Sequence, residues 1–335
     1  MLLAGAFTGC GEKNEAFENA MGLVQSLDYE EALAQFEEAE NTGANGRLVN
    51  RGRGIAYMGL TDYDQAITCF QQALSASSGI LENVDFDLNY YMAAAYAKSG
   101  RYQEAEDTYN AILALRSNEE DAYFLRGNVR LSLSDFEGAK EDFDQVISMD
   151  SKNYDRLIEI YEVLDNFGYK EAGQAYLQAA LNSGDKSMDT YVMGRIYYYL
   201  EEYQKAYLAL EEAKDKGGVE SYLYLGRAYE ATGDYNYASN VYGSYLSQYD
   251  GNAEIYNQLG LCELNKGDYQ KALEAFQAGL QLEGNLVQQS LAFNEIVAYE
   301  YLGNYEQAYE LLTNYMKSYP DDEQARRELD FLSTR

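Results

Sequence analysis

The chain has 335 residues, and its 56 acidic against 25 basic side chains give a formal net charge of −31. A charge of this sign repels phosphate backbones, so we do not expect nucleic acid as a partner. Histidine is absent, which excludes Ser-His and Cys-His nucleophile pairs and histidine metal sites. No pair of carboxylates stands out by its position in the sequence. We therefore predict no catalytic residue, metal site or cofactor.

The first ten residues, MLLAGAFTGC, are small and apolar and lead directly into a polar segment. They are too few to span a bilayer and are typical of the end of a secretory signal. This segment resembles the lipobox of bacterial lipoproteins. The resemblance implies that residues 1–10 are a signal peptide remnant, that Cys10 is lipidated, and that the protein contacts a membrane only through that anchor.

An aromatic residue followed three positions later by alanine recurs nine times after this segment. The apolar spacing is helical on both sides of a short turn before each aromatic, so each copy is predicted to be a helical hairpin. The pairs are Tyr29/Ala32, Tyr63/Ala66, Tyr102/Ala105, Phe136/Ala139, Tyr169/Ala172, Tyr203/Ala206, Tyr235/Ala238, Tyr269/Ala272 and Tyr305/Ala308.

A small residue lies twelve positions before most of these alanines, where the two helices of a hairpin must approach each other closely. Ile160 and Ile296 take this place in the fifth and ninth copies, where we expect looser packing. The small residues are Ala20, Gly54, Ala93, Gly127, Gly194, Gly226 and Gly260. An insertion at residues 77–85 is predicted to be a protruding loop.

The segment after the last hairpin, residues 320–335, is predicted to be a closing helix. Acidic side chains come first after Pro320, where they suit the positive end of a helix dipole, and Arg326 and Arg327 follow. Ala325, Leu329 and Leu332 are spaced to face the last hairpin, whose apolar side would otherwise be exposed.

These residues resemble the tetratricopeptide repeat family, whose repeat is a helix-turn-helix with small residues at the crossing point, an aromatic at the turn and alanine in the second helix. The resemblance covers residues 13–318. It implies an all-α, right-handed α-solenoid of about nine hairpins, closed by the C-terminal capping helix. It also implies that the first helices of successive repeats line a groove that binds a protein or peptide.

Positions one helical turn from the crossing residues are predicted to line that groove. A tyrosine there would offer a partner a rigid aromatic ring with a hydroxyl group that forms hydrogen bonds. An arginine would offer a planar guanidinium group that donates hydrogen bonds to a carboxylate. Alternatively, Glu202, Glu220 or Glu230 neutralises the charges of Arg195 and Arg227. The predicted groove residues are Arg51, Tyr90, Phe124, Tyr161, Tyr191, Arg195, Tyr198, Arg227, Asn257 and Phe293.

Three functions are compatible with these patterns. The first is a non-enzymatic protein-binding scaffold, lipid-anchored to the extracytoplasmic face of the membrane in a bacterial cell envelope. The second is a cell-wall or carbohydrate binding protein, for which Tyr197, Tyr198 and Tyr199 would have to form a flat aromatic platform. The third is a cytoplasmic regulatory scaffold, which follows if Cys10 is never lipidated.

Overall fold

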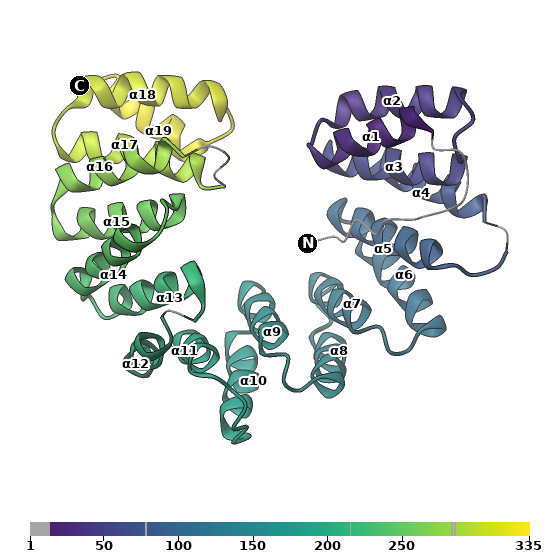
Figure 1. Ribbon diagram of the computed structural model, residues 1–335, viewed down its shortest axis with the longest axis horizontal. Helices are drawn as coiled ribbons and strands as arrows, with labels where there is room; N and C mark the ends of the chain where they lie inside the picture. The colour runs from purple at the N-terminus through teal and green to yellow at the C-terminus, as the bar shows by residue number, and fades with distance from the viewer. Residues whose placement is uncertain (1–13, 78, 215, 283, 285) are drawn as a thin grey trace. The chain divides into compact units, whose positions relative to one another are not determined.

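The computed structural model describes residues 14–335 except 78, 215, 283 and 285. Cys10 and the predicted signal remnant lie outside the described residues. The chain forms two compact units, Met1–Gly168 and Tyr169–Arg335. Every regular element in the described residues is an α-helix, which confirms the predicted all-α fold (Figure 1).

The described part of the first unit contains helices α1 to α9. Their bounds are α1 Glu15–Gln25, α2 Tyr29–Asn41, α3 Gly46–Gly59, α4 Tyr63–Ser75, α5 Asn83–Lys98, α6 Tyr102–Leu115, α7 Glu120–Ser132, α8 Phe136–Met149 and α9 Tyr154–Asn166.

The second unit contains helices α10 to α19 in its described residues. Their bounds are α10 Lys170–Asn182, α11 Thr190–Tyr199, α12 Tyr203–Ala213, α13 Gly218–Ala231, α14 Tyr235–Gln248, α15 Ala253–Lys266, α16 Tyr269–Leu280, α17 Gln288–Tyr301, α18 Tyr305–Ser318 and α19 Glu323–Leu332.

Several hairpins are held by a ring that covers a small residue at the helix crossing. A methyl group added at Gly54 would lie 2.3 Å from a ring carbon of Phe70, and one at Gly260 would lie 2.2 Å from Phe276. Gly127 with Phe143 and Gly226 with Tyr242 repeat this contact. The large side chain therefore fits only because the opposite helix has no side chain there.

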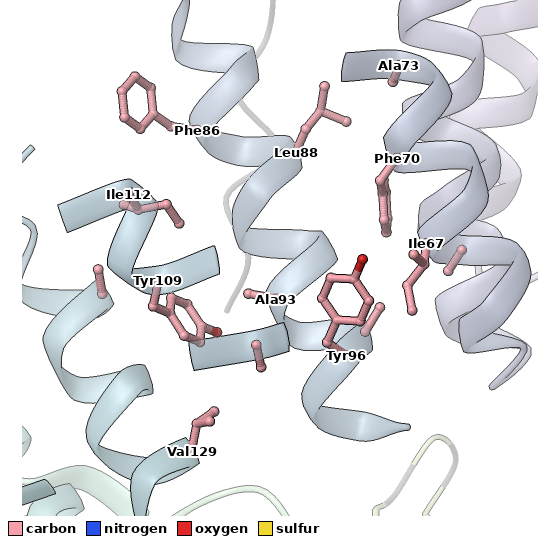
Figure 2. Packing of buried hydrophobic residues seen from close by; sticks show 14 of the residues in the cluster. Ile67, Phe70, Ala73, Phe86, Leu88, Ala93, Tyr96, Tyr109, Ile112 and Val129 are labelled. Carbon is pink, nitrogen blue, oxygen red and sulfur yellow. The ribbon is translucent and has the colours of Figure 1, made fainter. Parts of the chain in front are cut away.

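The same contacts continue between neighbouring hairpins, so the core is one layer of rings and aliphatic chains. In the first unit, Tyr109 of α6 is 2% exposed and belongs to one buried cluster with Phe70 of α4, and with Ala93 and Leu88 of α5. Figure 2 shows Phe70, Ala93 and Tyr109 on three successive helices of this cluster. A hairpin thus buries its apolar side only against the next hairpin.

The ninth hairpin departs from the pairing of a small residue with a ring. Ile296 stands in place of glycine and shares a buried cluster with Leu312, the residue that takes the position of the ring. A larger residue on one helix is thus matched by a smaller one on the other, which preserves the volume of the crossing. Both are fully or almost fully buried, at 1% and 0% exposure.

The fifth repeat differs in its second helix, because α10 begins one residue later than the pattern predicts. Tyr169 is the N-cap of α10, whereas the other second helices begin on their aromatic residue. The buried residues of α10 are Gly173 and Leu177, and Ala172 is only half-buried. In this helix the neighbouring glycine is therefore buried in place of the alanine of the pattern.

The turn inside each hairpin contains one residue in the left-handed conformation. Gly233, Gly267 and Gly303 take this conformation at φ of 79°, 82° and 75°. Thr61 and Glu201 take it at φ of 60° without being glycine. Because β-branched residues are rare in this region, the turn geometry is imposed by the packing of the two helices rather than chosen by Thr61.

The insertion forms a shorter loop than predicted, because α5 begins at Asn83. A capping box starts this helix, in which the Asp85 side chain accepts a hydrogen bond of 2.8 Å from the Glu82 amide. Arg47 of α3 pairs with both carboxylates, at 2.6 Å for Glu82. The residues predicted to end the loop are thus the first turn of a helix, fixed by an arginine of the preceding repeat.

The closing helix is α19, which packs against the last hairpin as predicted. Ala325 and Leu332 are buried in one cluster with Leu312 and Tyr315 of α18. Asp322 caps the helix by accepting a hydrogen bond of 3.0 Å from the amide of Ala325. The apolar end of the array is therefore covered.

The crossing can be tested by comparing two glycines of neighbouring helices in the second unit. Gly260→Ala should destabilise the protein by about 1 to 3 kcal/mol, because the new methyl group overlaps Phe276. Gly243→Ala should instead stabilise it by about 0.5 to 1 kcal/mol, since nothing lies within 4 Å and helical glycine is entropically costly. Urea unfolding followed by circular dichroism measures both changes, and equal effects would contradict the close crossing.

Candidate functional site

The first helices of successive hairpins approach one another within each unit and form a common layer. In the first unit α1 contacts α3 and α3 contacts α5, and in the second α11, α13, α15 and α17 contact each other in sequence. We call these helices the first-helix layer. Most of the predicted groove residues belong to it, Arg51 and Tyr90 in the first unit and Tyr191 to Phe293 in the second, whereas Phe124 and Tyr161 lie on α7 and α9.

Arg51 is tied to the neighbouring repeat rather than free for a partner. Its Nε donates to Oδ2 of Asp87 on α5 at 2.5 Å, and its guanidinium lies 5.4 Å from the ring of Tyr91. The side chain is 16% exposed. Arg51 therefore joins α3 to α5, and a partner would have to compete with Asp87 for it.

The predicted aromatic residues of the first unit are mostly packed into its core. The ring of Tyr90 is 6.2 Å from that of Tyr109, and its hydroxyl oxygen is buried without a hydrogen-bond partner among the described residues. Burial, aided by Glu119 and Asp121, raises the pKa of Tyr90. Phe124 lies 6.2 Å from Phe143 and is covered by the guanidinium of Arg156 at 4.4 Å.

Two predicted groove residues are too buried to contact a partner in this conformation. Tyr161 of α9 is 4% exposed, and Asn257 of α15 is 7% exposed. The side-chain oxygen of Asn257 accepts a hydrogen bond of 2.8 Å from Asn294 of α17. These two side chains, which were predicted to line the groove, are therefore largely inaccessible to a partner.

A cluster of tyrosine and arginine on α11 and α13 is the best candidate for a binding surface. Arg195 lies 5.4 Å from the ring of Tyr191 and 5.5 Å from the ring of Tyr224. Tyr198 packs edge to face on Tyr224 with the ring centroids 5.5 Å apart, and its burial raises its pKa. Tyr191, Arg195 and Tyr198 are half-buried, so part of each side chain faces solvent.

Arg227 lies beside this cluster on α13 and belongs to the same surface. Its Nη2 donates to Oε1 of Glu254 on α15 at 2.6 Å. An acidic side chain does pair with Arg227, as the alternative interpretation predicted. The acid is Glu254, however, and not Glu202, Glu220 or Glu230. The Arg227 and Glu254 side chains are 31% and 39% exposed, so water reaches the pair. We name Tyr191, Arg195, Tyr198 and Arg227 the tyrosine-arginine patch.

Phe293 lies farther along the second unit, on α17. It is half-buried, and its ring centroid is 5.8 Å from that of Tyr315 on α18. Phe293 therefore packs against the last hairpin and is only partly exposed to solvent.

The sequence patterns did not identify a stack of three tyrosines formed by α12, α13 and α14. Tyr207 and Tyr229 stack with centroids 4.7 Å apart, and Tyr229 and Tyr237 stack with centroids 5.3 Å apart. Tyr237 is 60% exposed, while burial and the Glu211 carboxylate raise the pKa of Tyr229 to about 12. The repeat pattern contains no signal for this stack, because Tyr207 and Tyr237 occupy surface positions of the second helices.

The structure also uses arginine inside the first unit in a way that the patterns did not reveal. Asp142 of α8 is 2% exposed and accepts from Arg126 at 2.5 Å and from Arg130 at 3.1 Å. A buried carboxylate needs such partners, since an unpaired charge there is strongly destabilising. These two arginines are therefore structural.

Family models described as tetratricopeptide repeat match five segments of the chain. The matched segments are residues 51–122, 120–153, 220–252, 253–286 and 293–322. Among the described residues, no helix is both long and apolar enough to cross a membrane.

The curated relatives share the repeats over a small part of their own length. RNA polymerase II-associated protein 3 of Xenopus tropicalis is 32% identical over 116 residues, which are 35% of this chain and 17% of that protein. The Xenopus laevis protein is 25% identical over 217 residues, which are 65% of this chain and 30% of that protein. The chain thus spans less than a third of these relatives.

Solved structures resemble the chain in fold alone. Yeast Tom70 is 16% identical with a TM-score of 0.52, covering 97% of this chain and 82% of that one. A tetratricopeptide repeat protein from Parabacteroides merdae is 15% identical with a TM-score of 0.48, covering 85% of this chain and 97% of that one.

Arg227 and Arg126 should differ in their effect on stability. Arg227→Gln should change the free energy of unfolding by less than about 1 kcal/mol, because its ion pair is partly exposed. Arg126→Gln should cost about 1 to 3 kcal/mol, because it removes a donor from buried Asp142. Denaturant unfolding of both variants measures this, and a larger loss for Arg227→Gln would mean that the patch is core.

Proposed function

The chain belongs to the tetratricopeptide repeat family, and from this premise we propose that it is a non-enzymatic scaffold that binds a protein partner on its first-helix layer. Domains of this family bind protein partners. The single observation that carries the proposal for this chain is the tyrosine-arginine patch on α11 and α13, where Arg195 lies over the Tyr191 and Tyr224 rings and Arg227 forms a partly exposed ion pair.

The chemistry of this patch indicates what part of a partner it binds. Tyrosine rings held by their neighbours lose little conformational freedom on binding, and arginine presents parallel donors to a carboxylate. Arg227 already donates one hydrogen bond of this kind to Glu254. We therefore propose that the partner segment carries an acidic side chain, which displaces Glu254 from Arg227 or binds Arg227 together with it. An apolar side chain next to this acid packs against Tyr191 or Tyr198.

We propose further that the protein is lipidated on Cys10 and acts at the extracytoplasmic face of a bacterial membrane. The support is the sequence of residues 1–10, with its apolar run ending at Gly9-Cys10. A cytoplasmic scaffold is the alternative. The name of the vertebrate relatives, RNA polymerase II-associated protein 3, describes association with another protein and supports the scaffold function without indicating a compartment.

Carbohydrate binding has less support, because the tyrosines expected to form its platform are not coplanar. The ring planes of Tyr198 and Tyr199 cross at 75°, and the Tyr199 hydroxyl lies 2.8 Å from that of Tyr224. Lys205 covers the Tyr197 ring at 5.3 Å. A sugar ring stacks on a flat aromatic face, and these three residues do not provide one together.

The partner surface can be tested with a photo-crosslinking amino acid placed at Tyr191 or, as a control, at Tyr237 on the tyrosine stack. A specific partner should crosslink at Tyr191 and not at Tyr237. Adding Arg227→Gln should reduce the yield of crosslinked product at Tyr191 at least several-fold, because the proposed contact between Arg227 and a carboxylate of the partner is lost. Mass spectrometry of the adducts identifies the partner. Equal yields from both positions, or no effect of Arg227→Gln, would contradict the proposed surface.

Lipidation is tested by expressing the full chain in a bacterium and measuring the intact mass of the membrane-bound protein, with Cys10→Ser as the control. We expect a lipid-modified chain that begins at Cys10, and an unmodified Cys10→Ser variant that leaves the membrane fraction. A native chain that keeps Met1 and remains in the soluble fraction would favour the cytoplasmic scaffold.

A further inference from the structure

A cavity of about 350 Å³ lies in the first unit, between α2 of the first hairpin and α3 and α4 of the second. Figure 1 shows these three helices next to one another near the start of the chain. The cavity is large enough for a small molecule. Its lining includes Glu37 of α2, Asn50 and Arg53 of α3, and Cys69 of α4.

Arg53 supplies the positive charge in this cavity, and its donors are only partly used. Its Nη1 lies 2.8 Å from Oε2 of Glu40, whose side chain is 54% exposed. An ion pair so open to water contributes little to stability. Among the described residues, Arg53 makes no other ion pair and no hydrogen bond, although a guanidinium group carries five N–H donors. Arg53 therefore has donors available for an anion that enters the cavity.

The fourth hairpin shows how the equivalent place is filled by the protein itself. Arg53 and Arg126 each lie one residue before the crossing glycine of their hairpin. Cys69 and Asp142 each lie three residues after the alanine of the pattern. Asp142 is buried, and its two oxygens accept hydrogen bonds of 3.0 and 2.5 Å from Arg126. The fourth hairpin thus holds a carboxylate under its arginine where the second hairpin has a thiol.

The thiol of Cys69 cannot replace this carboxylate. Cys69 is buried, and burial raises the pKa of its thiol, even though the charge of Arg53 acts in the opposite direction. A neutral thiol is only a weak hydrogen-bond acceptor. Arg53 therefore lacks the internal anionic partner that Arg126 has.

A second correspondence between the two hairpins adds an acid to the cavity. On α6 the residue five positions after the alanine of the pattern is Asn110, and its side-chain oxygen accepts a hydrogen bond of 2.7 Å from Arg126. On α2 this position is Glu37, whose carboxylate makes no hydrogen bond or ion pair among the described residues. The cavity therefore combines an arginine that can bind an anion with an acid that can bind a cation.

We propose that this cavity binds a small zwitterion, a free amino acid, whose carboxylate takes the place at Arg53 that the Asp142 carboxylate takes at Arg126. The amino group of the ligand binds Glu37. The side-chain amide of Asn50, which also lines the cavity, forms hydrogen bonds with the rest of the ligand.

The charge of the chain favours this class of ligand over a simple acid. A net charge of −31 repels molecules of net negative charge, whereas a zwitterion carries none. The cavity belongs to the first unit and the tyrosine-arginine patch to the second, so either site can be lost without the other.

Binding is tested by adding the standard L-amino acids one at a time to the full chain and measuring its melting temperature, followed by calorimetric titration. At least one should raise the melting temperature, because a ligand that binds only the folded chain stabilises it. The amide of that amino acid lacks the carboxylate, and its N-acetyl form lacks the cation. Each derivative should bind about tenfold more weakly or worse. No binding of any amino acid, or equal binding of either derivative, would overturn the site.

Two substitutions connect the binding to the cavity. Arg53→Gln removes the donors, and Cys69→Asp supplies an internal carboxylate as in the fourth hairpin. Each should raise the dissociation constant about tenfold or more. Arg101→Gln is the matched control, because it removes the same charge from a partly exposed ion pair outside the cavity, and it should leave the affinity unchanged.

Unchanged affinity in Arg53→Gln, or an equal loss in Arg101→Gln, would overturn the assignment of the ligand to this cavity. If Cys69→Asp does not fold, Arg53→Gln decides the question, because the Glu40 carboxylate that it leaves behind is exposed to water.

Discussion

The structure depends on the matching of side-chain sizes at the helix crossings, and at several of them one large side chain packs against one small residue. Where glycine faces a ring, as for Gly54 and Phe70, no additional methyl group fits. Where isoleucine replaces glycine, as at Ile296, a leucine replaces the ring. Because each hairpin is then covered by the next, an error at one crossing would affect its neighbours.

Ion pairs provide the second level of organisation, and they decide which arginines a partner can reach. The chain has few basic residues, and several join successive first helices, as Arg51 does with Asp87. Asp142 holds Arg126 and Arg130 inside the first unit. Arg227 differs, because both members of its pair remain in contact with water. A charged partner can therefore exchange with Glu254 at lower cost than with a buried acid.

The second unit thus separates stability from recognition. Its crossing residues are buried and close-packed, whereas the tyrosine-arginine patch is half-exposed and supported from behind by Tyr224. Because these rings are already held in place, they lose little conformational freedom when a partner binds, which favours affinity.

The sequence by itself determined the all-α fold, the helical hairpins and the closing helix, because these depend on local spacing of aromatic, small and capping residues. It could not determine that Tyr161 and Asn257 are buried, or that Glu254 pairs with Arg227. Those features depend on how one hairpin is rotated against the next, and this rotation is set by packing between residues of different repeats.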